Sequence, residues 1–287
     1  MNAPVPRRVT TNSCISKDGT QIGYRLMGKG PGLVLLHGGL QSSWNFTSLG
    51  AALCETFTIY IPDRRGRGLS GPFGDSYGIR TEVEDLNALL EKTGSQNIFA
   101  LSSGALVALQ AVLTLPAIRK MALYEPPLDI GGQLSPQHWV PRYEKELAAG
   151  NLAGAMVAIM KGTADRELFT SLPWFVLMPM FKLAMRWRPK PSQDDAPPLQ
   201  ELIPTMHFDA RLVAEMAGRL ESFKALCVET LLLGGTKSAS YLAAALDALS
   251  AIIPDCKRIT LTGLGHVAAD NSGKPAHVAD ELRRYFS

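Results

Sequence analysis

The segment from Asn97 to Ala108 constrains the fold more than any other part of the chain. Its β-branched and aromatic residues up to Leu101 are typical of a short buried strand, and the Ala, Leu and Val residues that follow favour a helix. Because a serine pair and Gly104 lie between the two, the chain must pass from strand to helix through one tight turn. Such a turn exposes a serine above the strand, in front of a helix N-terminus that favours negative charge. The segment therefore predicts a nucleophilic serine.

Two serines compete for the apex of this turn. The positions two before and two after the apex must be small, because strand and helix backbones come together there. With Ser102 at the apex these positions hold Ala100 and Gly104, whereas with Ser103 the first would hold the bulkier Leu101. We therefore predict Ser102 as the nucleophile, with Ser103 offering its backbone N–H. The alternative interpretation is a serine that only caps the helix of an ordinary α/β unit.

Short apolar runs alternate with helical patterns along most of the chain, which is typical of an α/β fold. Residues 9–27 predict a hairpin with a turn at Asp18-Gly19. Five further strands are expected at 33–36, 57–61, 121–124, 230–233 and 258–261. Together with the strand at 97–101 they predict a mostly parallel sheet of about eight strands, with helices on both faces. The alternation stops between 126 and 224, where only helices and loops are expected.

The composition argues against several classes of function. The net charge is +3 over 287 residues, and the basic residues are scattered, so nucleic-acid binding is not indicated. The four cysteines lie far apart without metal-ligand spacing, which favours free thiols and no metal site. The apolar segment 172–187 is interrupted by prolines and basic residues, so no membrane span is expected. Residues 1–8 lack the apolar part of a secretion signal, and we expect a cytoplasmic location.

Glycine-rich turns follow two of the expected strands. His37-Gly38-Gly39 comes after the strand at 33–36, and its glycines allow the N–H of Gly39 to approach a substrate oxygen. Paired with the N–H of Ser103, it would form an oxyanion hole, although a plain strand–helix turn is the alternative. His37 is interpreted as a structural hydrogen-bonding residue rather than a base.

Two more loops follow strands. The loop at 62–70 carries Arg64, Arg65 and Arg67 but matches no phosphate-binding motif, so we interpret it as a structural loop held by internal Asp–Arg pairs. His266 follows the last expected strand on a glycine-flexed loop. Because this position can reach back over the sheet toward Ser102, His266 is predicted to be the general base.

These motifs together resemble the α/β-hydrolase superfamily, and the resemblance runs from about residue 9 to residue 286. It implies a core of residues 1–125 and 225–287, with residues 126–224 forming the helical cap that this superfamily inserts after its sixth strand. It rests on four segments: residues 37–39, 62–68, 100–104 and 265–266.

The sequence departs from this resemblance at the acid of the catalytic triad. The superfamily usually places an aspartate after the strand that follows the cap, but residues 234–240 contain no carboxylate. Glu125, at the end of the strand expected next to the strand at 97–101, resembles the acid of a subset that includes lactone hydrolases acting on zearalenone. We therefore predict the triad Ser102–His266–Glu125. In the alternative, Glu125 pairs with an arginine, and His266 uses Ser238 or water.

Two other acids are weaker candidates. Asp129 lies close to Glu125 in the sequence, and Asp270 is interpreted as a local cap of the loop that carries His266.

The expected cap is rich in methionine and tryptophan, which suits an adaptable pocket for a fairly bulky apolar substrate. Seven of the ten methionines lie there, as do Trp139, Trp174 and Trp187. The alternative is that these residues only pack the cap helices together. As substrate-binding residues we predict Trp44, Trp174, Met178 and His207.

The sequence thus predicts a serine hydrolase that needs no cofactor or metal and acts on a small-molecule apolar ester or lactone. The alternatives are a C–C bond hydrolase of the same fold and a non-catalytic ligand-binding relative. A homodimer is left open.

Overall fold

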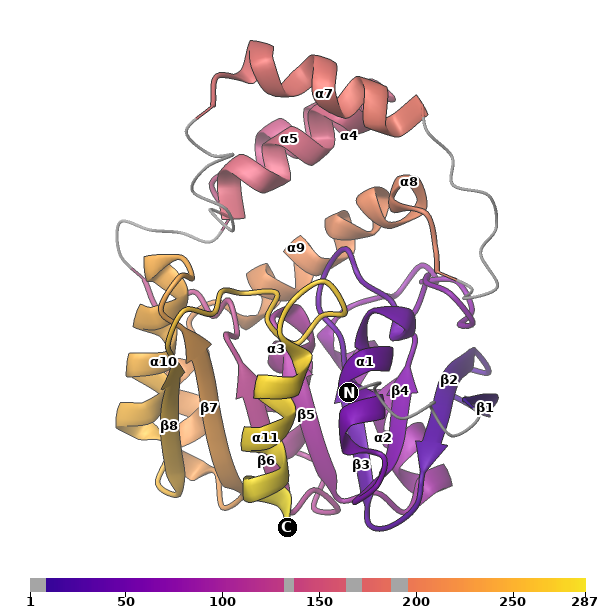
Figure 1. Cartoon of the computed structure of the whole chain (residues 1–287), viewed down its shortest axis with the longest axis vertical. Coiled ribbons are helices and arrows are strands. Elements are labelled where there is room, and N and C mark those ends of the chain that lie inside the picture. Colours follow the sequence, from indigo (N-terminus) through magenta and orange to yellow (C-terminus); the bar gives the residue numbers. More distant parts are fainter. Residues whose placement is uncertain (1–8, 132–136, 164–171, 187–195) are drawn as a thin grey trace, which may run out of the picture.

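The computed structural model describes residues 9–131, 137–163, 172–186 and 196–287, and its centre is one eight-stranded sheet. The strand order is β1-β2-β4-β3-β5-β6-β7-β8 (Figure 1). The first two strands pair antiparallel with each other, β2 pairs antiparallel with β4, and every other pair is parallel. The predicted fold class is confirmed. The strands are β1 (Thr10–Ile15), β2 (Gln21–Gly28), β3 (Gly32–Leu36), β4 (Thr58–Pro62), β5 (Asn97–Leu101), β6 (Lys120–Tyr124), β7 (Glu229–Gly235) and β8 (Cys256–Leu261).

Helices cover both faces of the sheet. On one face lie α1 (Thr47–Leu53) and α11 (Pro275–Phe286), and on the other lie α2 (Ile79–Thr93), α3 (Ser103–Val112) and α10 (Ser240–Ile252) (Figure 1). The sequence of strand β3 is apolar throughout because both faces of this strand are buried. Leu33 and Leu35 belong to the core cluster under α1 and α11, whereas Val34 and Leu36 belong to the cluster under α2 and α3.

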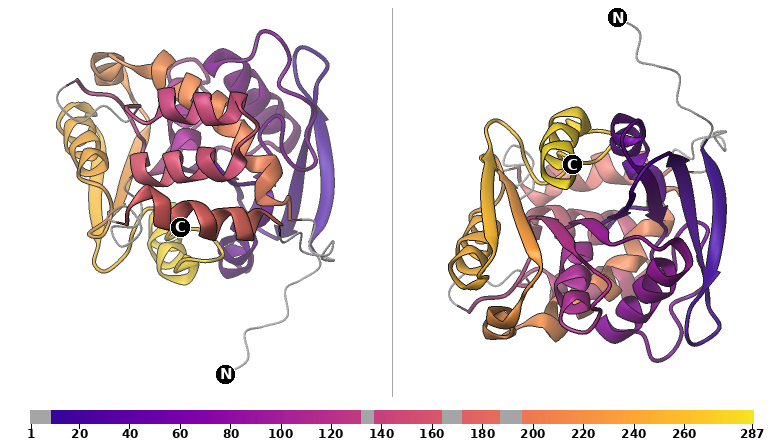
Figure 2. Two further views of the ribbon diagram at one scale, coloured as in Figure 1. Left: turned by 90° about the horizontal axis from the view of Figure 1, so that it is seen from above. Right: turned by 90° about the horizontal axis from the view of Figure 1, so that it is seen from below.

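The stretch between β6 and β7 contains helices and no strand among its described residues. Helices α4 (Val140–Ala148), α5 (Leu152–Thr163) and α7 (Trp174–Arg186) lie side by side above the carboxyl ends of the strands (Figure 2, left). The chain then returns toward the sheet through α8 (Leu199–Leu202) and the short turns η2 (Ile203–Thr205) and η3 (Leu220–Ala225). Between these turns, α9 (Met206–Met216) packs against α3 and α2 of the sheet layer. These helices between β6 and β7, called the cap below, therefore lie at the end of the sheet where ligands bind in open α/β folds.

Helices long and apolar enough to cross a lipid bilayer do not occur in the described parts of the chain.

Candidate active site

Ser102 occupies a strained turn between β5 and α3. Its backbone has φ 55° and ψ −125°, a left-handed conformation that costs energy for any residue except glycine. The turn is fixed because the N–H of Ser102 donates to the carbonyl of Tyr124 at 2.9 Å, and the N–H of Ala105 donates back to the carbonyl of Ser102 at 2.8 Å. A Cβ at Gly104 would overlap the carbonyl oxygen of His37, which explains why only glycine fits there.

Backbone strain gathers around this turn. Within the described residues, three non-glycine residues have positive φ, namely Leu40 (54°), Ser102 and Glu125 (48°). Leu40 lies just beyond β3, Ser102 directly follows β5, and Glu125 directly follows β6. Because these three strands are neighbours in the sheet, the strained residues lie at one edge. Clustered strain of this kind is typical of a functional site.

The structure brings Glu125 and His266 together. The Nδ1 of His266 lies 2.7 Å from Oε2 of Glu125, whose side chain is 1% exposed. The other carboxylate oxygen, Oε1, accepts the N–H of Gly235 at 2.6 Å. Thus the end of β7 supplies a backbone donor that orients the carboxylate of Glu125 at the end of β6. The loop of His266 is also held, because the hydroxyl of Tyr124 donates to the carbonyl of Gly265 at 2.9 Å.

The two weaker acids have other contacts. Asp129 accepts the N–H of Gly131. Asp270 does accept bonds from the nearby Ser272, but it also accepts bonds from Gln41 at 2.9 Å and Asn45 at 2.8 Å. Asp270 is therefore more than a local cap.

The predicted oxyanion loop is tied to the loop that carries His266. The N–H of Gly38 donates to Oε1 of Gln41 at 2.9 Å, and Nε2 of Gln41 donates to Asp270. Gly39 itself lies under the cap, since a Cβ there would be 2.6 Å from the sulfur of Met206. The loop, the histidine loop and the cap thus converge on one place.

A cavity of about 100 Å³ opens at this place. Ser102, His266, Gly39 and Ser103 all line it. The rest of its wall is mainly apolar and comes mostly from the cap, with Leu40, Pro127, Gln137, Trp139, Ile159, Thr163, Met206, Asp209, Ala210, Val213 and Tyr241.

The four predicted substrate-binding residues are not among those that line the cavity. Trp174 instead packs against the guanidinium of Arg142, whose carbon lies 4.0 Å from the ring centroid. The imidazole of His207 is half exposed and pairs with Glu144 at 2.8 Å.

Trp44 and Met178 are only partly buried, on the short turn η1 (Ser43–Phe46) and on the outer cap helix α7, respectively. Trp139 and Met206, which the cap composition included, take the pocket positions instead. Sequence composition did not show which of the methionine and tryptophan side chains face the cavity.

The arginine-rich loop corrects one interpretation. Asp63 does not pair with the arginines of its own loop but accepts the backbone N–H groups of Ser43 and Leu69. The arginines bind acids from other elements: Arg64 binds Glu82 and Asp209, Arg65 binds Asp18 and Asp85, and Arg67 binds Asp209. The loop is structural, as expected, but its ion pairs connect distant segments.

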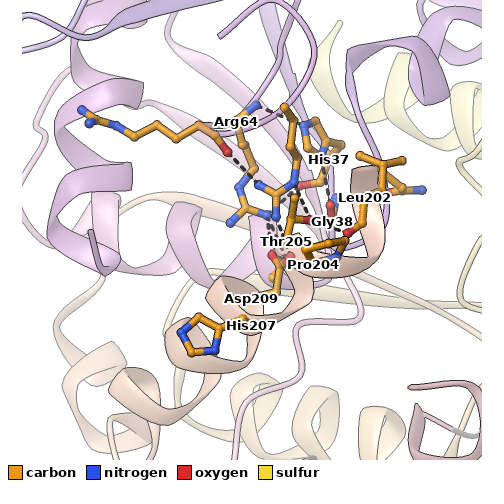
Figure 3. A network of polar contacts seen from close by, with 12 residues as sticks. His37, Gly38, Arg64, Leu202, Pro204, Thr205, His207 and Asp209 are labelled. Atoms are coloured by element: carbon orange, nitrogen blue, oxygen red, sulfur yellow. Dashed lines mark hydrogen bonds and ion pairs between the residues drawn. The ribbon is translucent and has the colours of Figure 1, made fainter. Parts of the chain in front are cut away.

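His37 has the structural role that the sequence predicted. Its Nε2 accepts the backbone N–H of Arg64 at 3.1 Å, and its Nδ1 lies 2.9 Å from the carbonyl of Gly38 (Figure 3). Burial, together with the charges of Arg67 and Arg64, holds the pKa of His37 well below its usual value. The ring is therefore neutral and can accept a bond on one nitrogen and donate on the other.

Sequence reasoning missed Asp209, which faces Arg64 in the same network (Figure 3). It is 3% exposed and lines the cavity from α9. Burial alone would raise the pKa of its carboxyl, but Arg67 and Arg64 and a hydrogen bond from Ser103 hold that pKa below its usual value. A sequence signal was present, because Asp209 is spaced three and four residues from Met206 and Val213 and therefore shares the apolar face of its helix.

Comparison with known proteins assigns the class. The model of the alpha/beta hydrolase family matches residues 33–279, so the chain belongs to this family. Among solved structures, an alpha/beta hydrolase from Sphaerobacter thermophilus DSM 20745 superposes with a TM-score of 0.75 at 25% identity, covering 96% of this chain and all of that one. Naproxen esterase (carboxylesterase NP) from Bacillus subtilis shares the fold, with a TM-score of 0.68 at 22% identity, covering 98% of this chain and 93% of that one.

Matches to particular curated proteins are shorter. The uncharacterized hydrolase YraK of Bacillus subtilis (strain 168) is 30% identical over 120 residues, which is 40% of this chain and 44% of that protein. N-formylmaleamate deformylase of Pseudomonas putida is 27% identical over 168 residues, which is 56% of this chain and 63% of that protein. Each of these matches therefore covers less than two thirds of the length of the relative.

Proposed function

We propose that this protein is a serine hydrolase that cleaves a carboxylic ester or lactone through an acyl-enzyme. The observation that carries this proposal is the 2.7 Å contact between His266 and Glu125 beside a cavity that Ser102 also lines. In this proposal Ser102 is the nucleophile, His266 the general base and Glu125 the acid that orients the histidine. The arrangement follows the logic of a Ser-His-acid triad.

The proposed reaction begins when Nε2 of His266 accepts the proton of Ser102 as Oγ attacks the substrate carbonyl. Glu125 holds the proton on Nδ1, so that Nε2 is the nitrogen that acts as base, and it stabilises the imidazolium that forms. His266 then returns its proton to the leaving alkoxide. Water, deprotonated by His266, attacks the acyl-enzyme and releases the acid and Ser102.

Negative charge on the carbonyl oxygen would be stabilised by the N–H groups of Gly39 and Ser103. Ser103 is the first residue of α3, and the first N–H groups of a helix have no partner within the helix. The positive end of the helix dipole adds to this effect. Both residues line the cavity with Ser102, which supports their assignment to the oxyanion hole.

The size and lining of the cavity narrow the proposed substrate. Its apolar wall supports the expected apolar ester or lactone, but about 100 Å³ is smaller than the roughly 300–1,000 Å³ typical of pockets for drug-sized ligands. We therefore propose that the group bound against this wall is compact and apolar, whereas the bulkier substrate that the cap composition predicts stays a prediction.

Labelling with an organophosphonate tests the proposal directly. We expect a mass shift on the peptide that contains Ser102 in the native protein and none in Ser102→Ala. On a short-chain p-nitrophenyl ester, Ser102→Ala should lower kcat by about four orders of magnitude or more, as the loss of a triad nucleophile does.

Ser238→Ala serves as the matched control. This serine lies just beyond β7, and its Oγ has no hydrogen-bond partner within the described residues. Labelling and turnover should be unchanged, whereas the alternative in which His266 relies on Ser238 requires a loss. A native protein whose Ser102 takes up no phosphonate would contradict the proposal.

A further inference from the structure

Asp209 connects a cap helix to the residues proposed for the oxyanion hole. Its Oδ1 accepts the hydroxyl of Ser103 at 2.7 Å and Nη1 of Arg64 at 2.9 Å. Its Oδ2 accepts Nη2 of Arg67 at 2.5 Å and lies 3.2 Å from where a Cβ of Gly39 would be. The carboxylate of Asp209 therefore lies next to both proposed oxyanion donors, Gly39 beyond the end of β3 and Ser103 beyond the end of β5.

The negative charge of Asp209 lies close to the place where the proposed reaction develops negative charge on the substrate. A carboxylate next to an oxyanion hole would oppose the negative charge that develops there. Here Arg64 and Arg67 neutralise it, and both guanidinium groups are almost fully buried. Since Glu82 pairs with the other side of Arg64, the cluster holds two arginines and two acids and its formal charge is balanced. Asp209 can thus hydrogen-bond to the site without imposing a net charge on it.

Ser103 is the residue on which these contacts act. Its hydroxyl donates to Asp209 and accepts from Nη1 of Arg64 at 3.0 Å. Two charge-assisted bonds therefore fix the side chain of the first residue of α3. The backbone N–H of this residue is a proposed oxyanion donor, so these bonds hold in place the residue that carries the donor.

We propose that Asp209 is a positioning residue of the oxyanion hole that acts through the hydroxyl of Ser103. Because Asp209 is carried by α9, the hole is fully aligned only when this cap helix is seated on α3. The inference rests on the proposed hydrolase function and adds a residue that neither the triad nor the family assignment requires.

A double-mutant cycle on kcat tests the inference. Asp209→Asn and Ser103→Ala should each lower kcat by about tenfold, less than the 10²–10³ typical when an oxyanion donor is lost outright, because the N–H remains. KM should change by less than about threefold, since the affected contact strengthens in the transition state. The double variant should be no slower than Ser103→Ala alone, because the carboxylate then has no hydroxyl through which to act.

The affinity of a trifluoromethyl ketone gives a second readout. This inhibitor forms a tetrahedral oxyanion with the serine, so its binding should weaken in parallel with kcat in both single variants. Asp85→Asn is the matched control, because Asp85 and Arg65 form a comparably buried ion pair in the same loop region, 2.6 Å apart. It should lower the unfolding midpoint yet leave kcat and inhibitor affinity within about twofold.

The outcomes separate a positioning role from a structural one. If Asp209→Asn slows catalysis as much in the Ser103→Ala background as in the native protein, the inference is overturned. Ser103→Ala removes no charge, so it carries the test alone should Asp209→Asn fail to fold, and an unchanged kcat would then refute the inference. Phosphonate labelling of native Ser102 distinguishes a failure of this inference from a failure of the proposed function. If native Ser102 is not labelled, the proposed function itself is contradicted.

Discussion

At the scale of single residues, the carboxylate proposed as the acid of the triad is held by two hydrogen bonds with different donors. Oε1 of Glu125 accepts from Gly235, and Oε2 faces Nδ1 of His266. A carboxylate can accept both bonds, whereas an amide offers only one acceptor oxygen. Glu125→Gln would therefore place an NH₂ group against either the backbone N–H or the histidine N–H.

We expect Glu125→Gln to lower kcat by roughly two to four orders of magnitude, since the wrong histidine tautomer would be favoured. Asp129→Asn is the comparison, because Asp129 binds a nearby backbone N–H at 3.0 Å and should leave kcat within about twofold. Steady-state hydrolysis of the same ester by both variants shows whether Glu125 or Asp129 is the acid on which kcat depends. Equal losses would show that the acid of the triad has been assigned to the wrong residue.

At the scale of secondary-structure elements, the turn between β5 and α3 depends on close approach to the end of β3. A Cβ at Gly104 would overlap the carbonyl oxygen of His37, and this oxygen belongs to backbone that cannot easily move. We expect Gly104→Ala to lower the free energy of unfolding by about 1–3 kcal/mol, as overpacking of a tight core does. Urea unfolding of the variant and of the native protein measures this difference in unfolding free energy.

Gly265→Ala is the control for that measurement, because the nearest atom to a Cβ there is 3.8 Å away and no strained φ is involved. Its unfolding free energy should change by less than about 0.5 kcal/mol. If both alanine variants unfold alike, the packing argument for Gly104 is incorrect.

The same elements show what the sequence could predict. Strand ends were predictable, because the apolar runs of β3, β5 and β6 are buried on both faces and each is followed by a motif. Parallel pairing then places Gly39, Ser102 and Glu125 at one edge without any further information. Helix α9 was different: its sequence places it in the cap region, but only tertiary packing shows that its Asp209 enters the arginine cluster.

At the scale of the whole molecule, buried charge links segments that are remote in the sequence. The arginine loop after β4 binds acids from α2, from α9 and from the first hairpin. His37 lies inside this network, fully buried and next to two arginines. A protonated His37 would be shielded from water by burial and repelled by the two arginines. The pKa of His37 is therefore held below the ordinary value of 6.5.

This depressed pKa makes folding sensitive to mild acid. Below about pH 6.5 an unfolded chain binds a proton on His37 that the folded chain does not bind, so stability is present above this pH and is lost as the pH falls. The loss should approach about 1.4 kcal/mol per pH unit. Asp209 does not contribute in this window, because its pKa is lowered from 3.8 and its stabilising effect is lost only at more acidic pH.

Urea unfolding at about pH 7.5 and about pH 5 measures the effect through the difference in unfolding free energy. In His37→Gln this difference should shrink, because glutamine can accept from Arg64 and donate to Gly38 without titrating. The exposed His277, replaced by glutamine, should leave the difference as it is in the native protein. Should His37→Gln lose stability in acid as steeply as the native chain, the proton must be taken up elsewhere, and the burial of a neutral imidazole would not explain the acid sensitivity.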